Sequence, residues 1–166
     1  MELKLDRIES PIGTVLLVTD DRSVVSLDFA EYEARCTALL AKRYGAYRLV
    51  PALDPLGASS RVRAYFDGAV TALDDLPVET GGTAFQRGVW LGLRKIPSGT
   101  TLSYGALAAS LGVPKASRAV GYANSLNPIA IALPCHRVVG ADCSLTGYAG
   151  GLDRKRWLLA HEGAAL

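Results

Sequence analysis

Three short segments rich in β-branched and aliphatic residues open the chain. They cover residues 3–9, 12–18 and 23–29. The stretches Pro-Ile-Gly at 11–13 and Asp-Asp-Arg at 20–22 separate them, and both are typical of turns. The pattern therefore predicts a small antiparallel sheet.

The spacing of apolar residues then changes to that of a helix. Residues 31–44 repeat small and aliphatic side chains at helical intervals and end before Gly45, and a second helical pattern covers residues 59–66. Residues 1–80 contain no histidine and no glycine-rich phosphate loop. We therefore expect residues 1–80 to form a mixed α/β support domain.

The second half begins with a helix start signal. Thr83 and Gln86 have the spacing of a capping box, and an amphipathic run follows as far as Ile96. Two further helical patterns, at residues 103–111 and 115–125, are joined by a Gly-Val-Pro turn. This pattern is typical of a helix-turn-helix, although a plain αα-hairpin has the same spacing.

These elements predict an α+β chain of two domains. The first, residues 1–80, is the small mixed α/β domain with its antiparallel sheet. The second, residues 81–166, is mostly helical and resembles a helix-turn-helix or winged-helix domain.

The second helix of the predicted pair carries mostly small residues, with Arg118 among them. A helix that reads the major groove normally presents several Asn, Gln, Arg or Lys side chains, and this one presents few. Two interpretations stay open. The helix either packs in the core, or it presses against DNA backbone or the minor groove with Arg118 as a probe.

Composition is that of an ordinary globular protein. The chain has 166 residues, of which 49% are hydrophobic and 20% charged. No apolar run reaches the roughly 18 residues of a membrane span, and the first ten residues carry charges where a signal peptide would be apolar. We therefore expect a cytoplasmic protein with no membrane partner.

Charge is divided unevenly between the two halves. Residues 1–80 hold 9 Lys and Arg against 13 Asp and Glu, whereas residues 81–166 hold 9 against 3, so the net charges are −4 and +6. A cationic second half suits a polyanion such as nucleic acid, although a solvated surface gives the same count.

The cysteines point to one reactive thiol. Cys36, Cys135 and Cys143 form no C-x-x-C pair, so neither a disulfide framework nor a zinc site is favoured, and we expect no metal and no cofactor. Cys135 follows an apolar run, residues 129–133, that we expect to be a strand. A cysteine in this position can be inert, but His136 and Arg137 next to it could favour the thiolate.

Three segments of the second half resemble the O6-alkylguanine-DNA alkyltransferase family. They are Asn-Pro at 127–128 through Pro-Cys-His-Arg-Val at 134–138, Thr-Gly-Tyr-Ala-Gly-Gly at 146–151, and Trp-Leu-Leu-Ala-His-Glu-Gly at 157–163. The resemblance is detailed over residues 81–163. It implies irreversible, single-turnover transfer of an alkyl group from O6-alkylguanine, and also O4-alkylthymine, in double-stranded DNA.

The resemblance also implies roles for individual residues. Cys135 matches the alkyl acceptor, and His136 and Glu162 match the pair that removes its proton through a bridging water. Asn127 matches the residue that braces the loop, and Tyr104 the donor to guanine N3. Arg118 matches the arginine that fills the gap left in the duplex by the flipped base. We also expect binding in the minor groove and a monomeric protein. The remaining implied residues are Lys115, Ala119 and Gly121 for DNA binding and Val138, Tyr148, Ala149 and Gly150 for the alkyl pocket.

Other interpretations of the same residues stay open. Taken singly, Tyr104 could be a core aromatic, Asn127 a turn residue, Glu162 a solvated charge and Arg118 a surface ion pair; their joint occurrence favours the functional set. A lesion-binding protein without transfer, a helix-turn-helix regulator and a cysteine hydrolase are the alternatives. Cys135 argues against the first, and the few base-reading side chains argue against the second.

Overall fold

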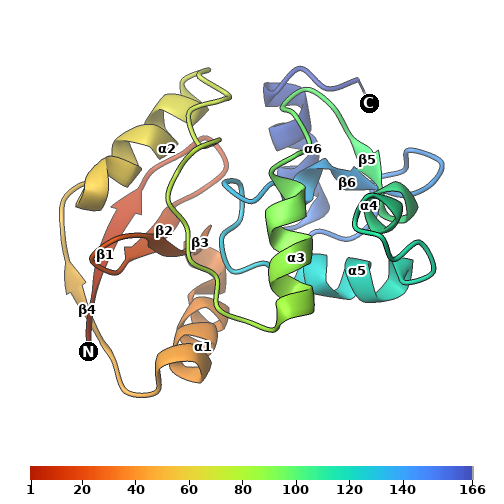
Figure 1. Cartoon of the computed structure of the whole chain (residues 1–166). Helices are drawn as coiled ribbons and strands as arrows, with labels where there is room; N and C mark the ends of the chain where they lie inside the picture. Colours follow the sequence, from red (N-terminus) through yellow and green to blue (C-terminus); the bar gives the residue numbers. More distant parts are fainter. Residues whose placement is uncertain (166) are drawn as a thin grey trace. The chain divides into compact units, whose positions relative to one another are not determined.

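The computed structural model describes residues 1–165, which fall into two compact units (Figure 1). The first unit holds Met1–Gly81 together with Pro128–Ala132. The second holds Gly82–Asn127 and the chain from Leu133 onward. The sequence predicted a boundary between residues 80 and 81. In the structure the first unit ends at Gly81 and also includes residues 128–132, which lie within the predicted second domain.

The first unit is built on a four-stranded sheet with the order β3-β2-β1-β4. The pairs β1–β2 and β2–β3 are antiparallel, as the sequence predicted, but β4 lies parallel to β1, so the sheet is mixed. The sequence analysis missed β4 because four residues that include Arg48 and Pro51 carry no strand pattern. The strands are β1 (Glu2–Ile8), β2 (Val15–Thr19), β3 (Val24–Phe29) and β4 (Arg48–Pro51).

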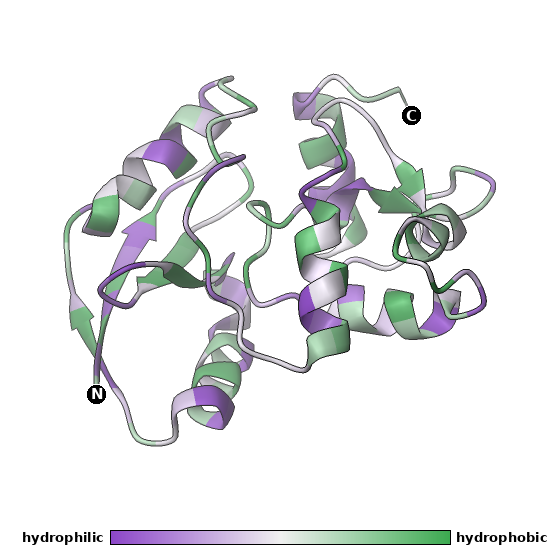
Figure 2. Cartoon of the chain, viewed as in Figure 1, coloured by the Kyte–Doolittle hydropathy of each residue, from purple (hydrophilic) through white to green (hydrophobic). Residues whose placement is uncertain are grey.

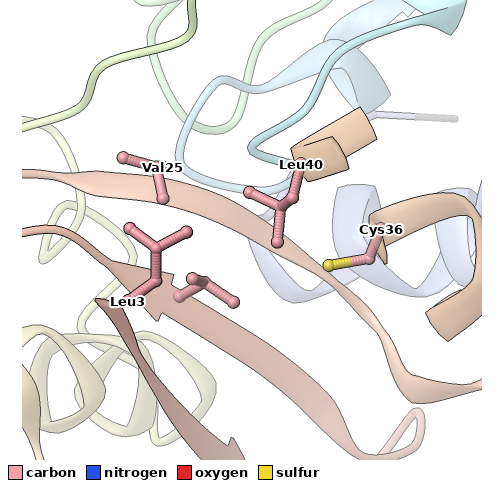
Figure 3. Close-up of a cluster of buried hydrophobic side chains, with 5 residues drawn as sticks. Leu3, Val25, Cys36 and Leu40 are labelled. Atoms are coloured by element: carbon pink, nitrogen blue, oxygen red, sulfur yellow. The ribbon is translucent and has the colours of Figure 1, made fainter. Parts of the chain in front are cut away.

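Two helices accompany this sheet, α1 (Glu33–Tyr44) and α2 (Ala58–Phe66). Helix α1 buries Cys36 and Leu40 in a cluster with Leu3 and Val25 (Figure 3). Every residue of β2 and β3 is buried, and Figure 2 draws β2 as largely hydrophobic. Apolar burial on this scale is the main term that stabilises a small unit.

The apolar residues 129–133 do not form the strand that the sequence predicted. Ile129 makes only an isolated bridge to Leu27 at the edge of the sheet, where the Leu27 carbonyl accepts from the Ala130 amide at 2.9 Å. Ile131 then has φ of 72°, in the left-handed region that a β-branched residue rarely adopts. The chain therefore turns inside this segment, and the prediction of a strand before Cys135 was wrong.

The second unit contains the predicted helices and a small parallel sheet. Thr83 and Gln86 form the predicted capping box, with each side chain accepting from the other residue's amide, at 3.1 and 3.0 Å. The two helices of the helix-turn-helix pattern pack together (Figure 1). The elements are α3 (Ala84–Leu93), β5 (Leu102–Ser103), α4 (Tyr104–Ser110), α5 (Ser117–Ser125), β6 (Val138–Val139) and α6 (Leu152–His161).

A buried carboxylate joins β1 to the start of α2. Asp6 is 8% exposed and accepts hydrogen bonds from the Ser59 hydroxyl at 2.6 Å and from the amides of Asp54 and Arg7 at 3.0 and 2.9 Å. Burial raises the pKa of Asp6, but these hydrogen bonds together outweigh burial and hold the pKa below its usual value. The ionised form of Asp6 is therefore the one that stabilises the fold.

We expect Asp6→Ala to lower the free energy of unfolding by roughly 1 to 3 kcal/mol, because it leaves the buried donors without an acceptor. Urea unfolding measures this change. Asp75→Ala is the control: its carboxylate pairs with Arg61 in solvent, so the change should stay within about 0.5 kcal/mol.

The destabilisation caused by Asp6→Ala should also depend on pH. Because the pKa of Asp6 is lowered in the folded chain, its contribution is complete above the unfolded pKa of about 4 and is lost as pH falls through the folded value. The difference between wild type and Asp6→Ala should therefore narrow below about pH 4. A difference that stayed constant down to the acid transition would contradict this account.

Candidate active site

The small parallel sheet brings Tyr104 toward the segment that contains Cys135. Leu102 pairs with Val138 and Ser103 with Val139. Helix α4 begins immediately afterwards at Tyr104, where the Ser103 hydroxyl caps the helix by accepting from the Ala106 amide at 3.0 Å. An aromatic phenol is thus fixed next to the cysteine segment by backbone pairing.

Cys135 is the first residue of a single 3₁₀ turn, Cys135–Arg137, that follows Pro134. Its side chain is buried, with 5% of the residue exposed. The side-chain amide of Asn127 donates to the Leu133 carbonyl at 2.7 Å and so holds the chain two residues before the cysteine. Asn124 makes a longer contact, at 3.5 Å, with the carbonyl of Cys135 itself.

Glu162 connects His136 and Arg137 in a buried network. Its Oε2 lies 2.8 Å from His136 Nε2, and the Arg137 guanidinium donates to both carboxylate oxygens, at 2.8 and 3.0 Å. The side chains of His136 and Glu162 are fully buried. Arg137 also donates to the Ile96 carbonyl at 2.7 Å. Glu162 is therefore a buried charge with two partners, and the alternative interpretation of Glu162 as a solvated charge was wrong.

Burial sets the protonation state of His136. Desolvation lowers the pKa of His136, and the hydrogen bond and charge of Glu162 oppose this only in part. The imidazole is therefore neutral at pH 7. A neutral ring whose Nε2–H donates to Glu162 keeps the lone pair on Nδ1, which has no hydrogen-bond partner among the described residues.

Lys155 is a buried cation that the sequence analysis did not single out. Its Nζ donates to the carbonyls of Val138, Thr146 and Gly147 at 2.6, 2.7 and 3.2 Å. Desolvation lowers the pKa of Lys155 to about 8, and the negative charge of a Cys135 thiolate acts in the opposite direction. The available signal was the spacing of Lys155, since residues 155, 158, 159 and 162 form one buried stripe along α6 and its C-cap.

A pocket of about 310 Å³ opens over Cys135. Five of the residues that the sequence assigned to the site line it, and three more had not been singled out. Val138 and Gly150, which were also expected there, do not line it: Val138 is buried in β6 with its carbonyl bonded to Lys155, and the buried Gly150 accepts from Arg154 at 3.1 Å. The lining residues are Tyr104, Gly121, Cys135, Tyr148 and Ala149, with Asn124, Ser125 and Gly147 in addition.

The predicted DNA-binding residues divide into two groups. Lys115, Arg118 and Ala119 are exposed at the start of α5. Gly121 instead faces α4, because a Cβ at this position would lie 3.5 Å from the Tyr104 ring. Helix α5 therefore has one face packed in the second unit and one exposed face, and contact of the exposed face with DNA stays a prediction.

The other two cysteines lie in different surroundings. Burial raises the pKa of Cys36, whose sulfur lies 3.1 Å from the Ser26 hydroxyl oxygen in the first unit. Cys143 is exposed. Among residues 1–165, no cluster of three or more His, Cys, Asp or Glu side chains could hold a metal ion. No helix in the same range is long and apolar enough to cross a bilayer.

Comparison with known proteins identifies the chain from end to end. Residues 84–164 match the 6-O-methylguanine DNA methyltransferase, DNA binding domain, and residues 4–80 match the ribonuclease-like domain of the same enzyme. The methylated-DNA–protein-cysteine methyltransferases of Shigella flexneri and Salmonella typhimurium are 45% and 46% identical over 169 residues. In both cases the match covers 100% of this chain and 99% of the relative.

Solved structures agree with these matches. The O6-methylguanine methyltransferase of Mycobacterium tuberculosis is 41% identical with a TM-score of 0.81, over 97% of this chain and 93% of that one. The M. tuberculosis OGT in complex with DNA is 37% identical with a TM-score of 0.79, over 98% and 93%. With a buried cysteine beside a His–Glu–Arg network and this similarity over both units, the chain belongs to the methylated-DNA–protein-cysteine methyltransferases, the enzymes that repair O6-methylguanine in DNA.

Proposed function

We propose that Cys135 accepts the alkyl group of O6-alkylguanine in double-stranded DNA, once and irreversibly, and that O4-alkylthymine reacts at the same site. The observation that carries this proposal is the His136–Glu162 contact of 2.8 Å behind a pocket that Cys135 and Tyr104 both line. A soft thiolate nucleophile suits in-line attack on an sp³ carbon.

The neutral His136 is the proposed base. Its Nε2–H donates to Glu162, so Nδ1 is the atom that accepts the proton of the Cys135 thiol. A bridging water carries this proton from the sulfur to Nδ1. The imidazolium that forms is then stabilised by the Glu162 carboxylate. Arg137 fixes the orientation of that carboxylate from the other side with two hydrogen bonds.

Lys155 supports the thiolate from α6. It stays mostly protonated at neutral pH, because its pKa of about 8 is still above 7, and its charge interacts favourably with that of a Cys135 thiolate. Its hydrogen bonds to the carbonyls of Thr146 and Gly147 also hold the loop that continues into the pocket wall at Tyr148. We therefore add Lys155 to the residues that prepare the nucleophile.

Tyr104 is the proposed donor to the leaving guanine. Transfer breaks the bond between O6 and the alkyl carbon and leaves negative charge on the base, which a phenol at N3 would offset. Asn127 braces the acceptor loop through its bond to Leu133. The product thioether has no easy hydrolytic route back to the thiol, so the protein acts once.

Access to the lesion requires the base to leave the duplex, at a cost of a few kcal/mol. The exposed Lys115, two residues before α5, and the exposed Arg118 and Ala119 in its first turn are the proposed contacts to the minor groove, with Arg118 occupying the vacated stack. One chain holds every residue that the reaction uses, so we propose that it acts as a monomer. The free thiol suits a reducing compartment such as the cytoplasm.

The first test is the stoichiometry of transfer. Incubated with excess O6-methylguanine duplex, the protein should gain the mass of one methylene group, on Cys135, and each chain should repair one lesion, as intact-mass and peptide analysis would show. Cys135→Ser should abolish transfer, whereas the exposed Cys143→Ser control should keep it. Many lesions repaired per chain would exclude the single-turnover reaction and favour a hydrolase.

The second test separates Arg118 from Tyr104. Arg118→Ala should slow repair in duplex DNA far more than reaction with free O6-benzylguanine, because a free base has no stack to leave. Tyr104→Phe should slow both reactions, by up to about 10²- to 10³-fold, since it removes leaving-group stabilisation from either substrate. Single-turnover rates of both variants on both substrates provide the measurement. Equal slowing of the two reactions by Arg118→Ala would make Arg118 a pocket or folding residue.

A further inference from the structure

Helix α5 exposes one large aromatic side chain, Tyr122. The residue is 69% exposed, and its hydroxyl has no hydrogen-bond partner among the described residues. A single exposed aromatic residue is common on protein surfaces and needs no explanation by itself. Its position along the helix gives Tyr122 a role.

Tyr122 lies between Arg118 and the mouth of the pocket. Arg118, Tyr122 and Ser125 are spaced by four and three residues, so they share one face of α5, and all three are exposed. Ser125 lines the pocket with Cys135. With a rise of about 1.5 Å per residue, Tyr122 is about 6 Å along the axis from Arg118 and about 4.5 Å from Ser125.

The charge around this face fits a polyanion. Residues 80–141 contain no Asp or Glu, whereas Lys115 and Arg118 are exposed at the start of α5. The exposed Ala119 on the same side is small, which lets a ligand approach the backbone. A duplex that placed its flipped base in the pocket and received Arg118 in its stack would pass directly over Tyr122.

We propose that Tyr122 is a second DNA-contacting side chain, which packs in the minor groove against the sugar and base edge of the nucleotide beside the lesion. This inference rests on the proposed function. A tyrosine ring is rigid and loses little conformational entropy on binding, while its face gives a large apolar contact.

The role belongs to binding of the duplex and not to the chemistry of transfer. Tyr122 does not line the pocket, whereas its neighbour Gly121 does. A substrate without a duplex, such as free O6-benzylguanine, reaches Cys135 without passing Tyr122. The two substrates therefore distinguish a DNA contact from a residue that supports the pocket.

The experiment compares Tyr122→Ala, Tyr122→Phe and the control Phe85→Ala. Phe85 is an exposed aromatic residue on α3, 41% exposed, in the same unit. Affinity for an O6-methylguanine duplex is measured by fluorescence anisotropy with Cys135→Ser added to each variant, so that no transfer occurs. Single-turnover rates on the duplex and on free O6-benzylguanine are measured with Cys135 intact.

We expect Tyr122→Ala to weaken duplex binding about tenfold, in the range found when an aromatic contact to a base is removed. It should slow subsaturating duplex repair about tenfold more than the free-base reaction. Tyr122→Phe should stay within about twofold of wild type because the ring is kept, and Phe85→Ala should behave as wild type.

Three results would overturn the proposal. They are unchanged duplex affinity in Tyr122→Ala, equal slowing of the duplex and free-base reactions, and a loss in Tyr122→Phe as large as in Tyr122→Ala. Wild-type transfer to Cys135 is measured in the same series. If wild type methylates Cys135 but Tyr122→Ala binds normally, only this inference fails. If wild type transfers no methyl group, the proposed function fails with it.

Discussion

The buried carboxylate of Glu162 is the constraint on which the second unit depends. An ion taken out of water costs several kcal/mol unless it is paired and hydrogen-bonded, and Glu162 meets this condition through His136 and Arg137. Satisfying it fixes the end of α6 against the 3₁₀ turn that begins at Cys135. Arg137 extends the same constraint to the carbonyl of Ile96. Charge burial therefore fixes one end of the turn that begins at the cysteine, and the Asn127 hydrogen bond to Leu133 holds the chain before it.

Two buried ionisable groups with different charges at pH 7 result from this packing. Desolvation keeps His136 neutral, so that it can accept a proton, while Lys155 keeps its charge at pH 7 because its pKa falls only to about 8. Burial lowers the pKa of both groups, but it starts from about 6.5 for the imidazole and about 10.5 for the ammonium, so only Lys155 stays above 7. Their partners also differ: His136 contacts a carboxylate, whereas Lys155 donates to backbone carbonyls.

Local patterns made much of the fold predictable. The first three strands, the helices and the capping box at Thr83 depend on neighbours within a few residues, and the structure confirms them. The parallel strand β4, the turn at Ile131 and the buried Lys155 depend on partners far along the chain, which periodicity does not reveal. In the site, the joint pattern around Cys135 identified the family. The sequence could not show that Val138 and Gly150 lie outside the pocket lining.

Because Pro128–Ala132 packs in the first unit, the folding of each half of the chain depends on the other half. The segment holds Ile129 and Ile131, both buried, and it hydrogen-bonds to Leu27 in the first unit. A fragment that began at residue 82 would leave these side chains without that partner strand and expose an apolar stretch prone to aggregation. The halves could not be exchanged as independent modules by a cut at residue 81. Recombination that preserves folding must carry both pieces of chain together.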